Sequence, residues 1–100
     1  MKKRKARPVW TVYILHCADG SLYTGITQDV ARRVAEHNSN GALAARYTRS
    51  RRPVALVYQE PAATRSAASK REYRIKKLPR TDKLTLVQGG RRKAGEILPT

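Results

Sequence analysis

Two apolar runs separated by a tight-turn dipeptide constrain the fold of this chain more than any other feature. Residues 9–15 (VWTVYIL) are rich in β-branched and aromatic side chains, and residues 21–27 (SLYTGIT) repeat that character. Between them stands Asp19-Gly20, which is typical of a β-hairpin turn. The sequence therefore predicts two antiparallel strands. Gly25, inside the second of them, indicates either a bulge or the close approach of another group.

The remaining pattern predicts one more strand and three helices. A helix capped by Thr27 or Asp29 is expected to run to about residue 38. A strand is expected over 53–60, a helix over 64–78 and a short helix over 82–87 that Gly89-Gly90 ends. Residues 39–52 are expected to form a long polar loop. The order β-β-α-β-α-α predicts an α+β fold, a small three-stranded, mainly antiparallel sheet flanked by helices. We expect one domain at 9–88, between a basic arm at 1–8 and a basic tail at 89–100.

The charge of the chain indicates its partner. The sequence holds 22 Lys+Arg against 7 Asp+Glu, a formal net charge of +15, which favours binding to nucleic acid. An anionic membrane is the main alternative, but no segment has the pattern of a membrane-bound amphipathic helix or of a span. Cys17 is the only cysteine, and His16, Cys17 and His37 lack the spacing of a zinc site. We expect a cytoplasmic protein without zinc.

Two tyrosines lie on the predicted hairpin. Tyr13 and Tyr23 stand on neighbouring strands, so they can share one face of the sheet. Most strand tyrosines simply pack, with the hydroxyl at the edge of the core. A phenol has a pKa near 10, so it accepts a proton from water only where cations stabilise the phenolate. This chain offers such cations nearby.

Arg33 and His37 fall one turn apart on the first predicted helix, with Val30, Ala31 and Val34 expected to face the core instead. A solvated arginine and a surface histidine are the common alternatives. A guanidinium suits a phosphate that gains charge in a transition state, and an imidazole could bind phosphate or position a water.

Glu72 is surrounded by lysines and arginines on the second predicted helix. A simple ion pair with Lys76, four residues on, is the alternative to a functional role. The functional interpretation is one carboxylate ligand for one Mg²⁺ or Mn²⁺ ion, whose shell the substrate's phosphate oxygens would complete.

Several further side chains are candidates for nucleic-acid contacts. The basic loop around Tyr47 would clamp a backbone and offer one stacking aromatic, and the Glu72 helix carries more cations. The candidate nucleic-acid-binding residues are Arg46, Tyr47, Arg49, Arg51, Arg52, Lys70 and Arg74.

The ordered set of these residues resembles the GIY-YIG nuclease superfamily, in particular its small bacterial single-domain proteins. Thr11-Val12-Tyr13 stands for the first motif and Tyr23-Thr24-Gly25 for the second. Arg33 and His37 follow at the family's spacing, and the metal-binding glutamate of the family matches Glu72.

This resemblance implies metal-dependent hydrolysis of DNA, on duplex or branched structures, in repair or recombination. It implies that Tyr13 or Tyr23 takes a proton from the attacking water and that Arg33 stabilises phosphoryl charge. His37 would support the base or hold phosphate, and Glu72 would anchor the metal. Relatives usually gain specificity from added DNA-binding domains, so we expect a recruiting protein partner. The alternatives are a non-catalytic DNA- or RNA-binding module, such as a ribosome-associated one, and a subunit active only inside a larger repair complex.

Overall fold

The computed structural model describes residues 9–39 and 46–95, and the side chains of 90–95 are outside this description. The elements in chain order are β1 (Trp10–Cys17), β2 (Leu22–Thr27), α1 (Val30–His37), α2 (Arg46–Arg49), β3 (Val54–Ala62), α3 (Arg65–Lys76) and α4 (Arg80–Gly95). Among the described residues, no helix is both long and apolar enough to cross a bilayer.

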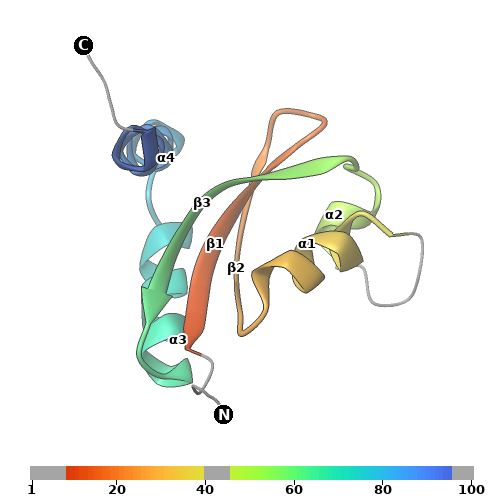
Figure 1. The fold of residues 1–100 in the computed structure, drawn as a ribbon. Helices are drawn as coiled ribbons and strands as arrows, with labels where there is room; N and C mark the ends of the chain where they lie inside the picture. The colour runs from red at the N-terminus through yellow and green to blue at the C-terminus, as the bar shows by residue number, and fades with distance from the viewer. Residues whose placement is uncertain (1–8, 40–45, 96–100) are drawn as a thin grey trace.

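The three strands form one antiparallel sheet in the order β2-β1-β3. Figure 1 shows β1 at its centre, with α3 and α4 on one side and α1 and α2 on the other. The structure therefore confirms the predicted α+β fold. Asp19 builds the hairpin turn by accepting hydrogen bonds from the amide and hydroxyl of Ser21, and Gly20 adopts the positive φ of 87° that glycine tolerates best.

Alternation along β1 sends neighbouring side chains into two separate cores. Val12 and Ile14 pack with Ile75 of α3 on one side, whereas Tyr13 and Leu15 belong to a second core beneath α1. The pairing of β1 with β3 shifts register between Ile14 and Leu15, but its pairing with β2 is continuous from residue 11 to residue 16. The central strand thus supplies both a structural core and the floor of a second, more polar layer.

Several predicted boundaries were wrong. The first strand continues through His16 and Cys17, beyond the apolar run of residues 9–15, and residues 46–49 of the predicted loop form α2. The last helix passes through Gly89-Gly90 and reaches Gly95. A glycine costs a helix only about 1 kcal/mol relative to alanine, and it ends one chiefly by adopting a positive φ. Of the described glycines only Gly20 does so. The predicted domain boundaries remain predictions.

The orientation of α1 also differs from the prediction. Ala31 is exposed, and His37 is fully buried at 0% exposure. The reason lies in the segment predicted as a loop, because Thr48 of α2 is buried against the imidazole. A local helical pattern cannot show this covering.

Candidate active site

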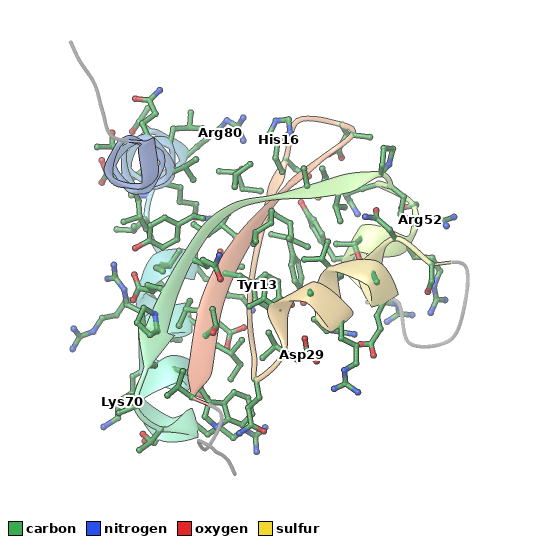
Figure 2. The ribbon with its side chains drawn as sticks, in the orientation of Figure 1. Tyr13, His16, Asp29, Arg52, Lys70 and Arg80 are labelled. Carbon is green, nitrogen blue, oxygen red and sulfur yellow. The ribbon has the colours of Figure 1, made fainter. Side chains whose placement is uncertain are left out.

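A chain of two buried hydrogen bonds joins β1, α1 and α2. The hydroxyl of Tyr13 lies 2.9 Å from Nε2 of His37, and Nδ1 of His37 lies 2.7 Å from Oγ1 of Thr48. Their exposed fractions are 1% for Tyr13 and 0% for both His37 and Thr48. A buried imidazole with a partner on each nitrogen has a fixed orientation. Figure 2 shows Tyr13 in the layer between the sheet and α1.

Gly25 makes this position of Tyr13 available. The two residues face each other across the β1–β2 pairing. A Cβ at position 25 would lie 2.6 Å from the Tyr13 hydroxyl oxygen and 2.7 Å from Cζ. The phenol therefore lies directly over the glycine. Of the two explanations for Gly25 offered by the sequence, the close approach is confirmed.

Changing Gly25 to alanine should displace the Tyr13 ring. Overpacking of this kind costs about 1–3 kcal/mol, and here it would also break the hydrogen bond to His37. We expect a lower urea midpoint and the loss of the nuclease activity that the family resemblance implies. Gly89→Ala is the matched control, since nothing lies within 4 Å of a Cβ built there. Full activity in Gly25→Ala would contradict the importance of the Tyr13 position.

Helix α1 brings Arg33 to the same place. Asp29 caps the helix by accepting a hydrogen bond from the Arg32 amide. One turn before His37, Nη1 of Arg33 donates to Oε1 of Glu36 over 2.8 Å. Arg33 also lowers the pKa of Tyr13 through its charge and a side-chain hydrogen bond. The guanidinium therefore favours the charged form of the phenol.

Burial keeps both partners of the central hydrogen bond uncharged. Desolvation, the largest effect, raises the pKa of Tyr13 to about 12, with a further rise from Tyr23 that Arg33 opposes. Desolvation also lowers the pKa of His37 to about 4, and the nearby Arg33 lowers it further. At neutral pH the pair is a phenol beside a neutral imidazole. Neither group carries a charge before substrate arrives.

The lowered pKa of His37 predicts a stability change with pH. An unfolded histidine binds its proton near pH 6.5, but folded His37 does so only near 4. The unfolded state therefore holds more protons between these values, and stability should fall by on the order of 3 kcal/mol as the pH drops through this window. His37→Gln should flatten this change in the free energy of urea unfolding between pH 6.5 and 4. Equal slopes in the wild type and His37→Gln would refute the assignment.

Glu72 approaches from α3, on the other side of the sheet. Its charge makes a small contribution to the raised pKa of Tyr13, after burial and Tyr23. The carboxylate pairs with Lys76 Nζ at 3.1 Å, and its side chain is 23% exposed. The described residues contain no group of three His, Cys, Asp or Glu side chains that could hold a metal ion by themselves. A single accessible carboxylate fits Mg²⁺ or Mn²⁺ when substrate oxygens complete the coordination shell.

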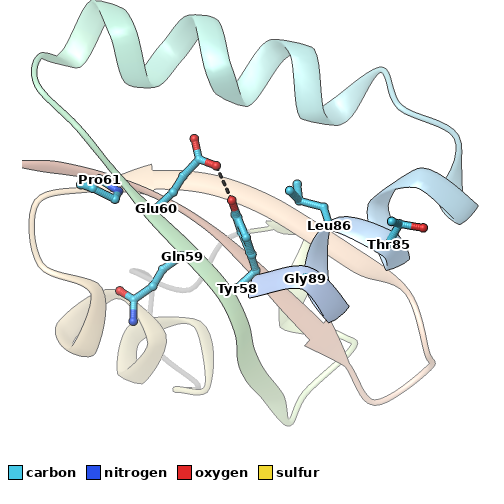
Figure 3. Close-up of a pocket in the computed structure, with 7 residues that line it drawn as sticks. All are labelled: Tyr58, Gln59, Glu60, Pro61, Thr85, Leu86 and Gly89. Atoms are coloured by element: carbon cyan, nitrogen blue, oxygen red, sulfur yellow. Dashed lines mark hydrogen bonds between the residues drawn. The ribbon is translucent and has the colours of Figure 1, made fainter. Parts of the chain in front are cut away.

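Glu60 of β3 is a poorer metal ligand. It accepts hydrogen bonds from Nε and Nη2 of Arg71 and from the hydroxyl of Tyr58. Figure 3 shows it in a pocket between β3 and α4. Glu60 pairs with Val12 of β1, which belongs to the core on the face of the sheet opposite Tyr13. Because its oxygens already have partners, Glu60 serves to join β3 to α3.

The predicted nucleic-acid-binding residues fall into two groups. Tyr47 stacks on Tyr23 with ring centroids 5.6 Å apart. Cζ of Arg51 lies 4.0 Å from the Tyr47 ring centroid, and Arg51 also pairs with Asp19. Arg52 donates to the Arg49 carbonyl. Arg46 is exposed beside them, and Lys70 and Arg74 lie exposed on α3. Figure 2 shows Arg52 and Lys70 at opposite ends of the molecule.

Four predicted site residues lie together, and one neighbour escaped prediction. The ring of Tyr23 packs edge-on against His37, with centroids 5.0 Å apart, and its centroid lies 6.5 Å from that of Tyr13. Arg33 is the fourth member of the group. Thr48 is the residue that sequence reasoning missed as a site member. The only sequence signal for Thr48 was its position beside Tyr47 in an unusually long polar segment.

Comparisons with known proteins identify the family of the chain. A model of the GIY-YIG catalytic domain matches residues 9–85. The UPF0213 protein DP2720 of Desulfotalea psychrophila is 66% identical over 82 residues, which cover 82% of this chain and 74% of that protein. The UPF0213 protein SERP0126 of Staphylococcus epidermidis is 57% identical over 79% of this chain and 94% of its own length.

Two solved structures are also similar. The solution structure of the protein EF2693 from E. faecalis has a TM-score of 0.57 and 34% identity, over 100% of this chain and 99% of that chain. The UPF0213 protein BH0048 from Bacillus halodurans has a TM-score of 0.51 and 44% identity, over 79% of this chain and 82% of that one. These matches to a nuclease-family domain and to small bacterial proteins show that the chain belongs to the GIY-YIG superfamily.

Proposed function

We propose that the protein is a divalent-metal-dependent endonuclease that hydrolyses DNA phosphodiester bonds. The observation that carries this proposal is the buried hydrogen bond of 2.9 Å between Tyr13 and His37, beside the Arg33 guanidinium. A packing tyrosine needs one partner for its hydroxyl, but it needs neither a second titratable group nor a guanidinium beside that partner. This combination supplies a proton acceptor and a phosphate ligand in one place.

The hydrogen-bond chain defines a path for the proton of the attacking water. With Nδ1–H of His37 donating to Thr48, Nε2 accepts the hydroxyl hydrogen of Tyr13. As the water oxygen bonds to phosphorus and the bond to the leaving oxygen breaks, the Tyr13 oxygen takes the water proton. The proton of Tyr13 passes to His37 Nε2 in the same step. No free phenolate is needed, which matters because the pKa of Tyr13 is about 12.

The substrate itself helps His37 to hold that proton. In the free protein, burial and Arg33 keep the pKa of His37 near 4. A bound phosphodiester adds negative charge beside the imidazole and attracts the Arg33 guanidinium, so both effects should raise this pKa. Arg33, held by Glu36 over 2.8 Å, is placed to donate to the phosphoryl oxygens as their charge grows.

Glu72 would hold the metal ion, with the substrate providing further oxygen ligands. The ion would supply positive charge at the phosphate and the leaving oxygen. In the free protein this carboxylate pairs with Lys76 at 3.1 Å. No motif for base-edge recognition is apparent, so specificity should follow DNA shape and charge. We place the activity in cytoplasmic DNA repair or recombination, with a recruiting protein partner.

A panel of labelled duplex, single-stranded, flapped and branched DNA tests this proposal, with wild-type protein and Mg²⁺ or Mn²⁺. We expect cleavage at a junction or flap to exceed cleavage of plain duplex. Equal cutting of every shape would contradict structure-directed cleavage. No cutting of any of them would contradict the enzyme.

Thr48 should control the tautomer of His37. Thr48→Val removes the partner of Nδ1, and a buried group left unpaired costs about 1–3 kcal/mol. We expect cleavage to slow by about 10-fold, and the pH–rate profile to shift, since the imidazole loses its fixed orientation. Thr48→Ser keeps the hydroxyl and should restore both. A serine variant as slow as the valine variant would show that Thr48 acts through packing alone.

A further inference from the structure

The outward face of α3 carries an exposed aromatic side chain. Tyr73 is 61% exposed, more than the other exposed large hydrophobic side chains of the described residues, Val9 at 52% and Tyr47 at 37%. The ammonium of Lys77 lies 5.0 Å from its ring centroid. A shallow hollow of about 350 Å³ borders the ring and is lined by Ser69, Lys70, Tyr73 and Arg74. One face of a large flat side chain therefore lines an open hollow.

The cations around Tyr73 differ from the other cations of α3 in their ion pairing. Arg71 pairs with Glu60 and Lys76 pairs with Glu72. Within the described part of the chain, Lys70 and Arg74 form no ion pair with an acidic side chain. Both are exposed, as is Lys77. Residues three and four apart share a helix face, so 70, 73, 74 and 77 form one stripe of three cations around one ring.

The chemistry of this stripe matches a polyanion with flat groups. Unpaired cations attract phosphates, and an exposed ring stacks on a nucleobase. A base can reach Tyr73 only where it is unpaired, because in a duplex its faces are already stacked on neighbouring bases. Glu72 precedes Tyr73 in the chain, and both lie on α3. A strand on the stripe would thus lie on the helix that carries the candidate metal ligand.

We propose that the face formed by Lys70, Tyr73, Arg74 and Lys77 binds an unpaired DNA strand, with one base on the Tyr73 ring and phosphates on the three cations. This rests on the proposed function and refines it, since it names the substrate as DNA with a single-stranded arm beside the cleavage point.

Binding of a short labelled oligothymidine, followed by fluorescence anisotropy in EDTA, tests the proposal without cleavage. Stacking contributes about 1–3 kcal/mol per base, so Tyr73→Ala should weaken this binding by about 10-fold or more. Tyr73→Phe keeps the ring and should bind within about 2-fold of wild type. A blunt duplex should bind both variants within about 2-fold of wild type. Because Tyr73 is exposed, thermal melts of the variants should match the wild type.

Three results would overturn the proposal: unchanged oligothymidine binding in Tyr73→Ala, an equal loss on duplex and single strand, or tighter binding of oligouridine than of oligothymidine. The last would make RNA the ligand. If wild-type protein bound oligothymidine as predicted but cleaved none of the DNA shapes in Mg²⁺ or Mn²⁺, the nuclease would be rejected and this site would be kept.

Discussion

Replacing Tyr13 by phenylalanine is expected to slow DNA cleavage by about 10²- to 10⁴-fold, the contribution of a positioned acid–base group. The ring would still fill its place over Gly25, but the 2.9 Å hydrogen bond to His37 would be lost. Single-turnover cleavage rates at saturating protein measure the effect directly. DNA binding should stay within about 2-fold, since the buried hydroxyl is replaced by hydrogen only.

Tyr23→Phe is the matched control. Tyr23 also lies in the site, but its ring meets His37 edge-on and no hydrogen bond from it to the imidazole is found among the described residues. We therefore expect it to keep most of the activity. A larger loss in Tyr23→Phe than in Tyr13→Phe would reverse the roles of the two phenols and contradict the proton path through His37.

Changing Glu72 to glutamine should reduce cleavage by about 10²- to 10⁴-fold, which corresponds to the several kcal/mol that a bound metal ion contributes. The glutamine is nearly the same size but lacks the charge that attracts a divalent cation. Binding to DNA in EDTA should be retained, and the dependence of the rate on metal concentration should move to higher concentrations.

Lys76→Ala distinguishes a metal ligand from a structural ion pair. It breaks the 3.1 Å contact with Glu72 but leaves the carboxylate in place. An exposed pair of this kind contributes only about 0.3–0.5 kcal/mol to stability, so folding should barely change. Activity should persist in Lys76→Ala and disappear in Glu72→Gln. If both variants lost activity and DNA binding together, Glu72 would be structural.

Local sequence patterns predicted the part of the fold that local chemistry determines. The Asp19-Gly20 turn and the two apolar runs predicted the hairpin, and Thr64 caps α3 through the Ala67 amide. Helix ends were harder. Glycine disfavours a helix only weakly, and the packing of Leu86 and Val87 on the core outweighs the cost of Gly89 in α4. Propensity alone could not show that packing.

The candidate site depends on contacts between distant segments. Tyr13 and His37 are 24 positions apart in the sequence, and His37 and Thr48 are 11 apart. Neither spacing indicates that these residues are in contact. Chain spacing placed Arg33 and His37 on one helix face, yet it suggested a surface histidine where the structure has a buried one. The order of the motifs thus indicated which side chains to consider, and the tertiary packing determined how they meet.

Charge alone does not separate the proposed nuclease from a binding module. Both would hold DNA through the same cations, and both would lose affinity with salt, by about 0.9 in log K per phosphate contact on duplex DNA for each unit of log salt. Only bond cleavage distinguishes them, and a complex-dependent subunit would also show none by itself.

The most direct test of the central claim compares wild type and Arg33→Ala, purified identically, on flapped and branched DNA in Mg²⁺, Mn²⁺ or excess EDTA. The parallel preparation exposes a contaminating nuclease, which would cut equally in both samples. The account predicts metal-dependent cleavage by the wild type that is lost in EDTA and in Arg33→Ala. Cleavage that persists in EDTA, or that is equal in both proteins, would contradict it.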